Sequence, residues 1–335
     1  MKDFWTILVT LQSLLSLAFT VPVPDKLNVR DVRAISQSDF DTISLYEQYA
    51  AAAYCPSNFN GSVPALVTCR SNNCDLVQKA KAAAIYKIAP NSLTDTRGYI
   101  AVDNVNKLIV VAFRGSETVA NFLANLLSIF LTRVDLCTGC QGGSGFWISW
   151  TRNRAQIIQQ VKNLLNNPAR QNYTVLVTGH SLGGAIGNFA AFELRIAFPK
   201  TTVDMATFGA PATGNLIFTS QLSKQDRIRG RNFRVNHLGD PVPNLPPIRG
   251  FTSVTPAFTI NTANQIVPAP KDFTMLEGAS ALNPGVTNPF DFMPHAFYIN
   301  AISACFVTPA AFVANITLPL KFTYGSEYPQ MEASL

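Results

Sequence analysis

The chain has 335 residues, of which 47% are hydrophobic and 14% charged, and its formal net charge is +6. This composition excludes a disordered chain, because it supplies enough apolar side chains for a large core. The positive charge forms no Lys/Arg run and no basic stripe interleaved with aromatics, which argues against nucleic acid as a partner. No change in composition marks a linker, so we expect one large domain over residues 34–306.

The chain begins with the pattern of an export signal. Lys2 precedes an uncharged apolar run over residues 4–19, and residues 20–24 then break that run. The run is short for a membrane-spanning helix, and a buried N-terminal helix is the alternative interpretation. We expect residues 1–20 to be a cleaved signal peptide, residues 21–33 to be a candidate propeptide, and the mature chain to be secreted without a transmembrane segment.

The chain has six cysteines, which is consistent with export to an oxidising compartment. An even number in an exported chain indicates three disulfides, although the sequence pattern leaves their pairing open. Cys137 and Cys140 form a CTGC motif without the thioredoxin-like context of a redox pair, so a structural disulfide is the preferred interpretation. Because the cysteine spacing lacks the histidine pairs of a zinc site, we expect no metal and no organic cofactor. The candidate N-glycosylation sites are Asn60, Asn172 and Asn315.

Predicted helices and strands alternate along the chain. The predicted helices show amphipathic or apolar helical patterns, and they cover residues 39–54, 117–131, 146–166, 182–198 and 295–307. The predicted strands are short apolar runs, and they cover residues 99–103, 107–113, 174–178, 202–208 and 232–236. Residues 240–294 are rich in Pro, Asn and Gly and predict mostly loop. The alternation predicts an α/β fold with a mostly parallel central sheet flanked by helices.

The segment TVLVTGHSLGGA contains a G-x-S-x-G pattern from Gly179 to Gly183. An apolar strand leads directly into the pattern and a helix leads directly out, which is the context of a nucleophile turn. We expect Ser181 to be the nucleophile at the apex of this turn, with Gly179 and Gly183 avoiding side-chain clashes. We also expect Gly184 and Gly187 to let the helix pack close to the sheet. An ordinary glycine-containing loop is the alternative interpretation.

A serine hydroxyl needs a neighbouring base to take its proton, and the chain has three histidines. His180 is next to Ser181 in the turn, so its side chain points elsewhere and we expect it to be structural. In sheets of this kind the chain order is Ser, then Asp or Glu, then His. We take His295 as the base in preference to His237, because it leaves room for an acid between itself and Ser181. A plain helix-start residue is the alternative interpretation of His295.

Asp240 is the predicted orienting acid, because it lies just past a predicted strand end, where sheet enzymes place catalytic side chains. A turn-forming Asp before Pro241 is the alternative interpretation. The competing acids are weaker candidates, since Asp226 lies in a polar stretch and no predicted strand precedes Asp272 or Asp291.

The predicted strand over residues 107–113 runs into an Arg-Gly-Ser tripeptide. We expect the backbone N–H groups of Ser116 and Leu182 to form the oxyanion hole, with a simple Gly-Ser turn as the alternative for Ser116. The following segment repeats apolar residues at the spacing of one helix face. Such faces usually pack on a core, but the position after the oxyanion loop favours a lid. The predicted lid residues are Val119, Phe122, Leu123 and Leu126.

Together these residues resemble the fungal class 3 lipase family, the filamentous-fungal triacylglycerol lipases, over most of the chain. The landmarks are AAAYC, FRGSETVANFLANL, CTGC, VTGHSLGGA, TFGAPATGN, RVNHLGDPVP and the pair His295-x-x-Tyr298. The resemblance implies an α/β-hydrolase fold with a helical lid around Thr118–Leu126. It implies a catalytic triad of Ser181, Asp240 and His295. It also implies an oxyanion hole formed by Ser116 and Leu182. The disulfides that it implies are Cys55–Cys305, Cys69–Cys74 and Cys137–Cys140.

From this resemblance we expect a secreted, monomeric lipase that hydrolyses acylglycerol esters at a lipid–water interface through an acyl-enzyme. A feruloyl-type esterase shares the fold but has a polar lid, and no residue settles a phospholipase A1 activity. A catalytically silent lipid-surface binder is the non-enzyme alternative. Residues 307–335 form an apolar tail broken by Pro and Asn, which is either a processed C-terminal extension or an extra surface segment.

Overall fold

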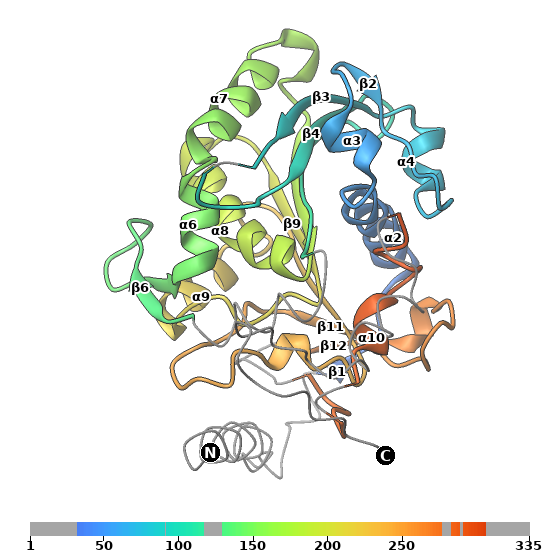
Figure 1. Ribbon diagram of the computed structural model, residues 1–335, viewed down its shortest axis with the longest axis vertical. Coiled ribbons are helices and arrows are strands. Elements are labelled where there is room, and N and C mark those ends of the chain that lie inside the picture. The colour runs from blue at the N-terminus through green and yellow to red at the C-terminus, as the bar shows by residue number, and fades with distance from the viewer. Residues whose placement is uncertain (1–31, 91, 117–128, 277–282, 289–290, 306–335) are drawn as a thin grey trace, which may run out of the picture.

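A ten-stranded sheet runs through the molecule in the computed structural model, which describes residues 32–90, 92–116, 129–276, 283–288 and 291–305 (Figure 1). The strands are β1 (Val32–Arg33), β2 (Ala65–Leu66), β3 (Ala83–Ile88), β4 (Gly98–Asp103), β5 (Leu108–Phe113), β6 (Leu131–Arg133), β7 (Gln141–Gly143), β8 (Thr174–His180), β9 (Val203–Phe208), β10 (Asn232–His237), β11 (Ala257–Ile260) and β12 (Phe273–Leu276). The helices are α2 (Gln37–Ala52), α3 (Pro56–Asn60), α4 (Asp75–Lys79), α6 (Ser144–Thr151), α7 (Arg154–Leu165), α8 (Leu182–Ala197), α9 (Leu216–Ser223) and α10 (Met293–Ala296). Short 3-10 turns cover Pro168–Arg170, Val242–Asn244 and Pro270–Asp272.

The centre of the sheet is parallel. Strands β11, β10, β9, β8 and β5 are parallel neighbours in that order. Antiparallel pairs complete both ends, with β4, β3 and β2 beyond β5 and with β12 and β1 beyond β11. Every residue of β5 is buried, as expected of a strand covered on both faces. The predicted mostly parallel central sheet is confirmed, and the antiparallel ends are additional.

Helices cover both faces of the sheet, which makes three layers (Figure 1). Helix α2 packs on β8, β9 and β5 from one side, and α8 packs on the same strands from the other, with α6 and α7 beside it. Each side has its own apolar cluster, one containing Trp150 and Phe189 and the other containing Tyr49 and Phe233. Because β5, β8 and β10 run parallel, their carboxyl ends lie at the same edge of the sheet. The predicted site residues follow these strand ends.

Two predicted helices differ from the structure. The helix predicted over 146–166 is two helices, α6 and α7, because the chain turns at residues 152–153. The helix predicted over 295–307 is wrong beyond Ala296, since Phe297 has extended backbone angles of φ −136° and ψ 125°. The chain then continues through turns to Cys305. A disulfide to the distant Cys55 holds Cys305 in place.

Residues 240–294 contain more regular structure than predicted. Strands β11 and β12 lie in this stretch and extend the sheet beyond β10. Strand β3 and helix α9 also had no predicted counterpart. Within the predicted helix over 117–131, residues 117–128 lie outside the described residues, and Leu131 begins a strand instead.

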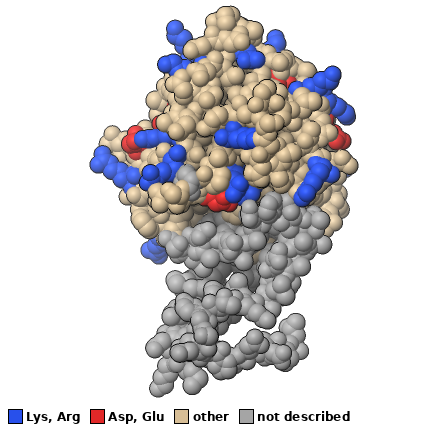
Figure 2. Space-filling view, turned by 45° about the horizontal axis from the view of Figure 1, so that its top comes forward, with Lys and Arg blue, Asp and Glu red and all other residues tan. Residues whose placement is uncertain are grey.

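Several predicted segments lie outside the described residues, namely the signal peptide, residues 21–31 of the candidate propeptide, the four lid residues and the tail from residue 306. The last two residues of the candidate propeptide form β1, which pairs with β12. Among the described residues, no helix is both long and apolar enough to cross a bilayer. On the face shown in Figure 2, Lys and Arg side chains are spread over the surface and form no continuous stripe.

Candidate active site

Ser181 occupies a sharp turn between β8 and α8. Its backbone angles are φ 56° and ψ −127°, in a region that non-glycine residues rarely adopt. The Ser181 N–H donates to the Phe208 carbonyl at 2.9 Å, and the N–H of Gly184 donates to the Ser181 carbonyl at 3.0 Å. The strand, the turn and the helix thus have the geometry that positions a nucleophile.

Steric limits explain the small residues around this turn. A Cβ on Gly179 would lie 2.4 Å from the Gly183 carbonyl carbon, and a Cβ on Gly183 would lie 2.3 Å from the Phe113 oxygen. A Cβ on Gly184 would lie 2.8 Å from the Ala210 Cβ, so close packing requires glycine there as well. Gly187 differs from the expectation, because a Cβ at this position would make only ordinary contacts of 3.6 Å and longer.

The structure brings His295 and Asp240 together. Asp240 follows β10 in a tight turn, and His295 lies in α10, 55 residues later. The His295 Nδ1 and the Asp240 Oδ2 are 2.8 Å apart, and both side chains are buried. Since a carboxylate accepts, Nδ1–H donates, which leaves Nε2 of a neutral imidazole able to take a proton. The pair predicted as base and orienting acid is therefore in contact.

Three further groups hold the Asp240 carboxylate and its turn. The Val242 N–H donates to Oδ1 at 2.9 Å, and the Tyr298 hydroxyl donates to Oδ2 at 2.5 Å. Asn283 Nδ2 donates to the backbone carbonyls of His237 and Asp240 at 2.7 and 2.8 Å. Burial, reinforced by the Asp240 charge, raises the pKa of Tyr298 well above its usual range, so this hydroxyl remains a donor.

Tyr298 and Asn283 were not predicted as site residues. Tyr298 was visible only as a landmark three residues after His295, and its spacing indicated no contact. Nothing in the sequence pattern around Asn283 distinguishes it from other loop asparagines, since its role arises from backbone carbonyls distant in the chain.

The His295 imidazole lies beside the nucleophile turn. A Cβ on Gly209 would lie 2.8 Å from both the Nδ1 and the Cε1 of His295. Gly209 directly follows Phe208, whose carbonyl binds the Ser181 N–H. The rings of His295 and His180 have centroids 4.4 Å apart. The ring of His295, the predicted base, thus lies next to the Ser181 turn, against the residues that follow β8 and β9.

The residues weighed against these candidates make other contacts. His237 Nδ1 lies 3.0 Å from the Leu238 carbonyl, and burial lowers the pKa of His237. Asp226, Asp272 and Asp291 accept hydrogen bonds from backbone N–H groups near them in sequence, at 2.6 to 3.0 Å. None of these hydrogen bonds joins them to the Asp240 and His295 pair.

The proposed oxyanion loop adjoins the nucleophile turn. It follows β5, and Gly183 packs against the Phe113 and Arg114 carbonyls. Arg114 donates to Asp95 at 3.0 Å and lies 5.1 Å from the Phe59 ring, which anchors the start of the loop. Ser116 is half-buried two residues later, and Leu182 is the first residue of α8. The first N–H groups of a helix have no intrahelical partner, so they can bind an anion.

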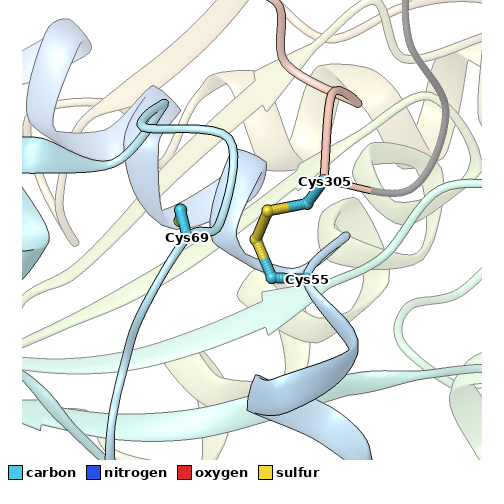
Figure 3. A group of neighbouring side chains, drawn as sticks. All are labelled: Cys55, Cys69 and Cys305. Carbon is cyan, nitrogen blue, oxygen red and sulfur yellow. A yellow bond between two sulfur atoms is a disulfide. The ribbon is translucent and has the colours of Figure 1, made fainter.

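The cysteines form three disulfides, Cys55–Cys305, Cys69–Cys74 and Cys137–Cys140. These are the pairs that the resemblance implied. Figure 3 shows that Cys69 lies near the Cys55–Cys305 disulfide, and the three sulfur atoms are within 4.8 Å of one another. Because each sulfur is disulfide-bonded, this group offers no thiolate to a metal. The predicted glycosylation residues Asn60 and Asn172 are exposed, and Asn315 lies outside the described residues.

Comparisons with known proteins give a consistent result. Residues 110–250 match the family model for Lipase (class 3), and residues 10–84 match that for Lipase 3 N-terminal region. The secreted mono- and diacylglycerol lipase A of Penicillium cyclopium is 35% identical over 289 residues, which cover 84% of this chain and 90% of that protein. Secreted mono- and diacylglycerol lipase 1 of Fusarium solani is 33% identical, covering 96% of this chain and 93% of that protein.

Solved structures agree. The crystal structure of mono- and diacylglycerol lipase from Aspergillus oryzae matches with a TM-score of 0.73 and 30% identity, covering 81% of this chain and 99% of that chain. Together with the helix-flanked sheet, this similarity confirms the expected α/β-hydrolase fold.

Proposed function

The chain belongs to the class 3 lipase family, and from this premise we propose that it hydrolyses acylglycerol esters with Ser181 as nucleophile, His295 as base and Asp240 as orienting acid. The observation that carries the proposal is the 2.8 Å contact of His295 with Asp240, beside the strained Ser181 turn. These groups come from three separate segments of the chain, and a histidine bound to a carboxylate beside a candidate nucleophile is the geometry that a serine hydrolase requires.

The chemistry follows from the arrangement. The His295 Nε2 takes the Ser181 hydroxyl proton as the Ser181 oxygen attacks the ester carbonyl carbon. The N–H groups of Leu182 and Ser116 stabilise the negative carbonyl oxygen of the tetrahedral intermediate. The imidazolium then gives its proton to the departing glycerol oxygen, which leaves an acyl-enzyme. Water, activated by the same imidazole, releases the fatty acid and restores Ser181.

The names of the relatives bear on the substrate. The Penicillium and Fusarium proteins are described as mono- and diacylglycerol lipases, so partial glycerides are the first substrates to test beside triacylglycerols. A lipase rather than a feruloyl-type esterase is also favoured by the apolar pattern of the predicted lid helix, since a polar lid suits a soluble substrate.

All three residues of the proposed triad are buried. The exposed fractions of Ser181, His295 and Asp240 are 4%, 1% and 0%. Bulk water therefore hardly competes for the hydrogen bonds of this group, which strengthens them. We propose a secreted enzyme working at the lipid–water interface, in line with relatives named as secreted.

Replacement of the nucleophile tests the proposal. Ser181→Ala should lower kcat on emulsified mono-, di- and triacylglycerols by about 10⁴-fold or more and abolish labelling by an alkyl phosphonate. A panel that adds phosphatidylcholine and a soluble feruloyl ester ranks the substrate classes. Substantial hydrolysis by Ser181→Ala, or labelling of another serine in the wild-type chain, would contradict the proposal.

A further inference from the structure

Two buried side chains outside the triad connect its parts. The Tyr54 hydroxyl lies 2.6 Å from His180 Nδ1, and His180 Nε2 lies 2.9 Å from the backbone carbonyl oxygen of His295. Tyr54 follows α2, and His180 is the last residue of β8, directly before Ser181. Tyr54, His180 and His295 are at most 2% exposed. The contacts therefore join three distant segments in the interior, where water does not compete for them.

The chemistry of the partners fixes the direction of each hydrogen bond. The His295 carbonyl can only accept, so His180 Nε2 carries a proton. Burial, together with a smaller electrostatic effect of the neighbouring His295 ring, lowers the pKa of His180 well below its usual range, which keeps the His180 ring neutral. A neutral ring protonated at Nε2 has a bare Nδ1, which accepts the Tyr54 hydroxyl proton. This tautomer satisfies both ring nitrogens.

The same tyrosine reaches the proposed oxyanion loop. The Tyr54 hydroxyl packs directly against Gly115, since a Cβ on Gly115 would lie 2.0 Å from the Tyr54 oxygen and 2.8 Å from the His180 carbonyl oxygen. The contacts thus run from Gly115 through Tyr54 and His180 to His295. Only a glycine fits beside the Tyr54 hydroxyl at this point of the loop, so the tyrosine fixes the path of the backbone that leads to Ser116.

We propose that Tyr54 and His180 are positioning residues, which hold the oxyanion loop, the nucleophile turn and the backbone of the base in one fixed relation. This inference rests on the proposed function, because it assigns the pair a role in that reaction. Neither side chain contacts a substrate in this role. Loss of the contacts that Tyr54 and His180 make should therefore lower the rate of the chemical step and leave substrate binding nearly unchanged. The reason is that small displacements of the reacting groups lower the rate strongly.

Tyr54→Phe tests the inference with the least disturbance, because it removes one oxygen and keeps the ring. We expect kcat to fall roughly 10-fold to 100-fold while KM stays within about twofold. Tyr46→Phe is the matched control, since Tyr46 is also a buried tyrosine, lies on α2, and its hydroxyl donates to Asp204 at 2.8 Å rather than to a residue of the proposed site. The control should keep wild-type kcat even if it loses as much thermal stability.

Variants of His180 keep the test decisive if Tyr54→Phe changes little. A glutamine at 180 can still donate an N–H to the His295 carbonyl, whereas a leucine cannot. We expect kcat to rank wild type, then His180→Gln, then His180→Leu, with the pre-steady-state rate of phosphonate labelling at Ser181 falling in the same order. Affinity for an alkyl boronic acid, whose serine adduct carries the oxyanion, should fall in parallel.

The labelling rate separates failure of this inference from failure of the proposed substrate. Phosphonylation needs Ser181, His295 and the oxyanion hole whichever ester the enzyme prefers. If the wild type is labelled but does not hydrolyse acylglycerols, the substrate proposal fails while the ranking of variants still tests the positioning pair. Labelling rates of Tyr54→Phe and His180→Leu within twofold of wild type, or losses that follow only the fraction of folded protein, would overturn it.

Discussion

The two halves of the candidate site are built in different ways. The nucleophile turn over residues 179–184 is continuous in sequence, and its shape follows from backbone contacts among its own glycines and the neighbouring strands. The predicted acid and base lie 55 residues apart, at the two ends of a stretch that contains β11 and β12, and side-chain hydrogen bonds hold them. The first half is a local motif, whereas the second exists only once the whole sheet has assembled.

This difference decides which kind of change each half tolerates. In the turn, an added carbon atom meets backbone atoms that cannot move aside. In the Asp240 and His295 half, the arrangement depends on whether each group donates or accepts its hydrogen bond. We therefore expect the turn to be damaged by added volume, and the Asp240 and His295 half to be damaged by a substitution that changes a donor or acceptor even when the size stays the same.

The largest expected effect comes from a change of chemistry without a change of size. Asp240→Asn replaces a carboxylate oxygen with an N–H group at the His295 contact, so the imidazole loses its preferred tautomer. We expect kcat to fall about 10⁴-fold while the protein remains folded, as judged by circular dichroism and Tm.

Asp226→Asn is the control, since Asp226 was the competing acid nearest to Asp240 in sequence and binds the Asn232 N–H instead. Its kcat should stay within about twofold of wild type. The reverse result, with Asp226→Asn inactive and Asp240→Asn active, would mean that the acid was assigned to the wrong residue.

A smaller free-energy effect is expected from added volume in the turn. In Gly179→Ala, the new Cβ would lie 2.4 to 2.8 Å from backbone atoms of Gly183 and Gly184, so the turn must distort. We expect a loss of roughly 3 kcal/mol in the free energy of unfolding, measured by urea denaturation, together with loss of activity.

Gly187→Ala provides the matched comparison eight residues further along the chain, inside α8. Its Cβ would meet side-chain carbons at 3.6 and 4.0 Å, which is ordinary contact, and alanine favours a helix over glycine by up to about 1 kcal/mol. The variant should be as stable as wild type or slightly more stable. Equal destabilisation by the two variants would show that backbone crowding does not set the shape of the turn.

The same contrast explains how far the sequence could be interpreted. Strands β5 and β8, helix α8 and the Ser181 turn were predictable because continuous buried runs and glycine spacing are local signals. Asp240 and His295 could be identified as the candidate acid and base, because the chain order of such sites is known and the chain has only three histidines. The contacts of Tyr298, Asn283 and Tyr54 could not be predicted, since they join segments far apart in the chain.

The incorrect helix over residues 295–307 has the same physical origin. Its apolar spacing is helical, but Tyr298 is held by Asp240, Asn300 by Glu47, and Cys305 by the disulfide to Cys55. These three anchors lie in different directions, so the chain follows them and gives up regular helical hydrogen bonds. Tertiary contacts outweigh a propensity that amounts to only tenths of a kcal/mol per residue.

One of those anchors is sensitive to pH. Glu47 on α2 is fully buried, and burial raises its pKa to about 8, only partly opposed by hydrogen bonds from Asn300. The folded protein therefore binds this proton more tightly than the unfolded chain, whose glutamate has its ordinary value near 4.5. The resulting stability is fully present below that ordinary value and is lost as the pH rises through about 8.

Glu47→Gln should remove this dependence, because the amide stays neutral and its oxygen can still accept from Asn300. Between pH 5 and pH 9, we expect the Tm of the wild type to fall by roughly 5 °C more than that of the variant. Glu193→Gln, which alters a partly exposed carboxylate bonded to Trp150, should keep the wild-type slope. Parallel Tm profiles for wild type and Glu47→Gln would mean that Glu47 does not titrate in the folded protein. The Asn300 contact with Glu47 would then hold the segment after His295 equally well across this pH range.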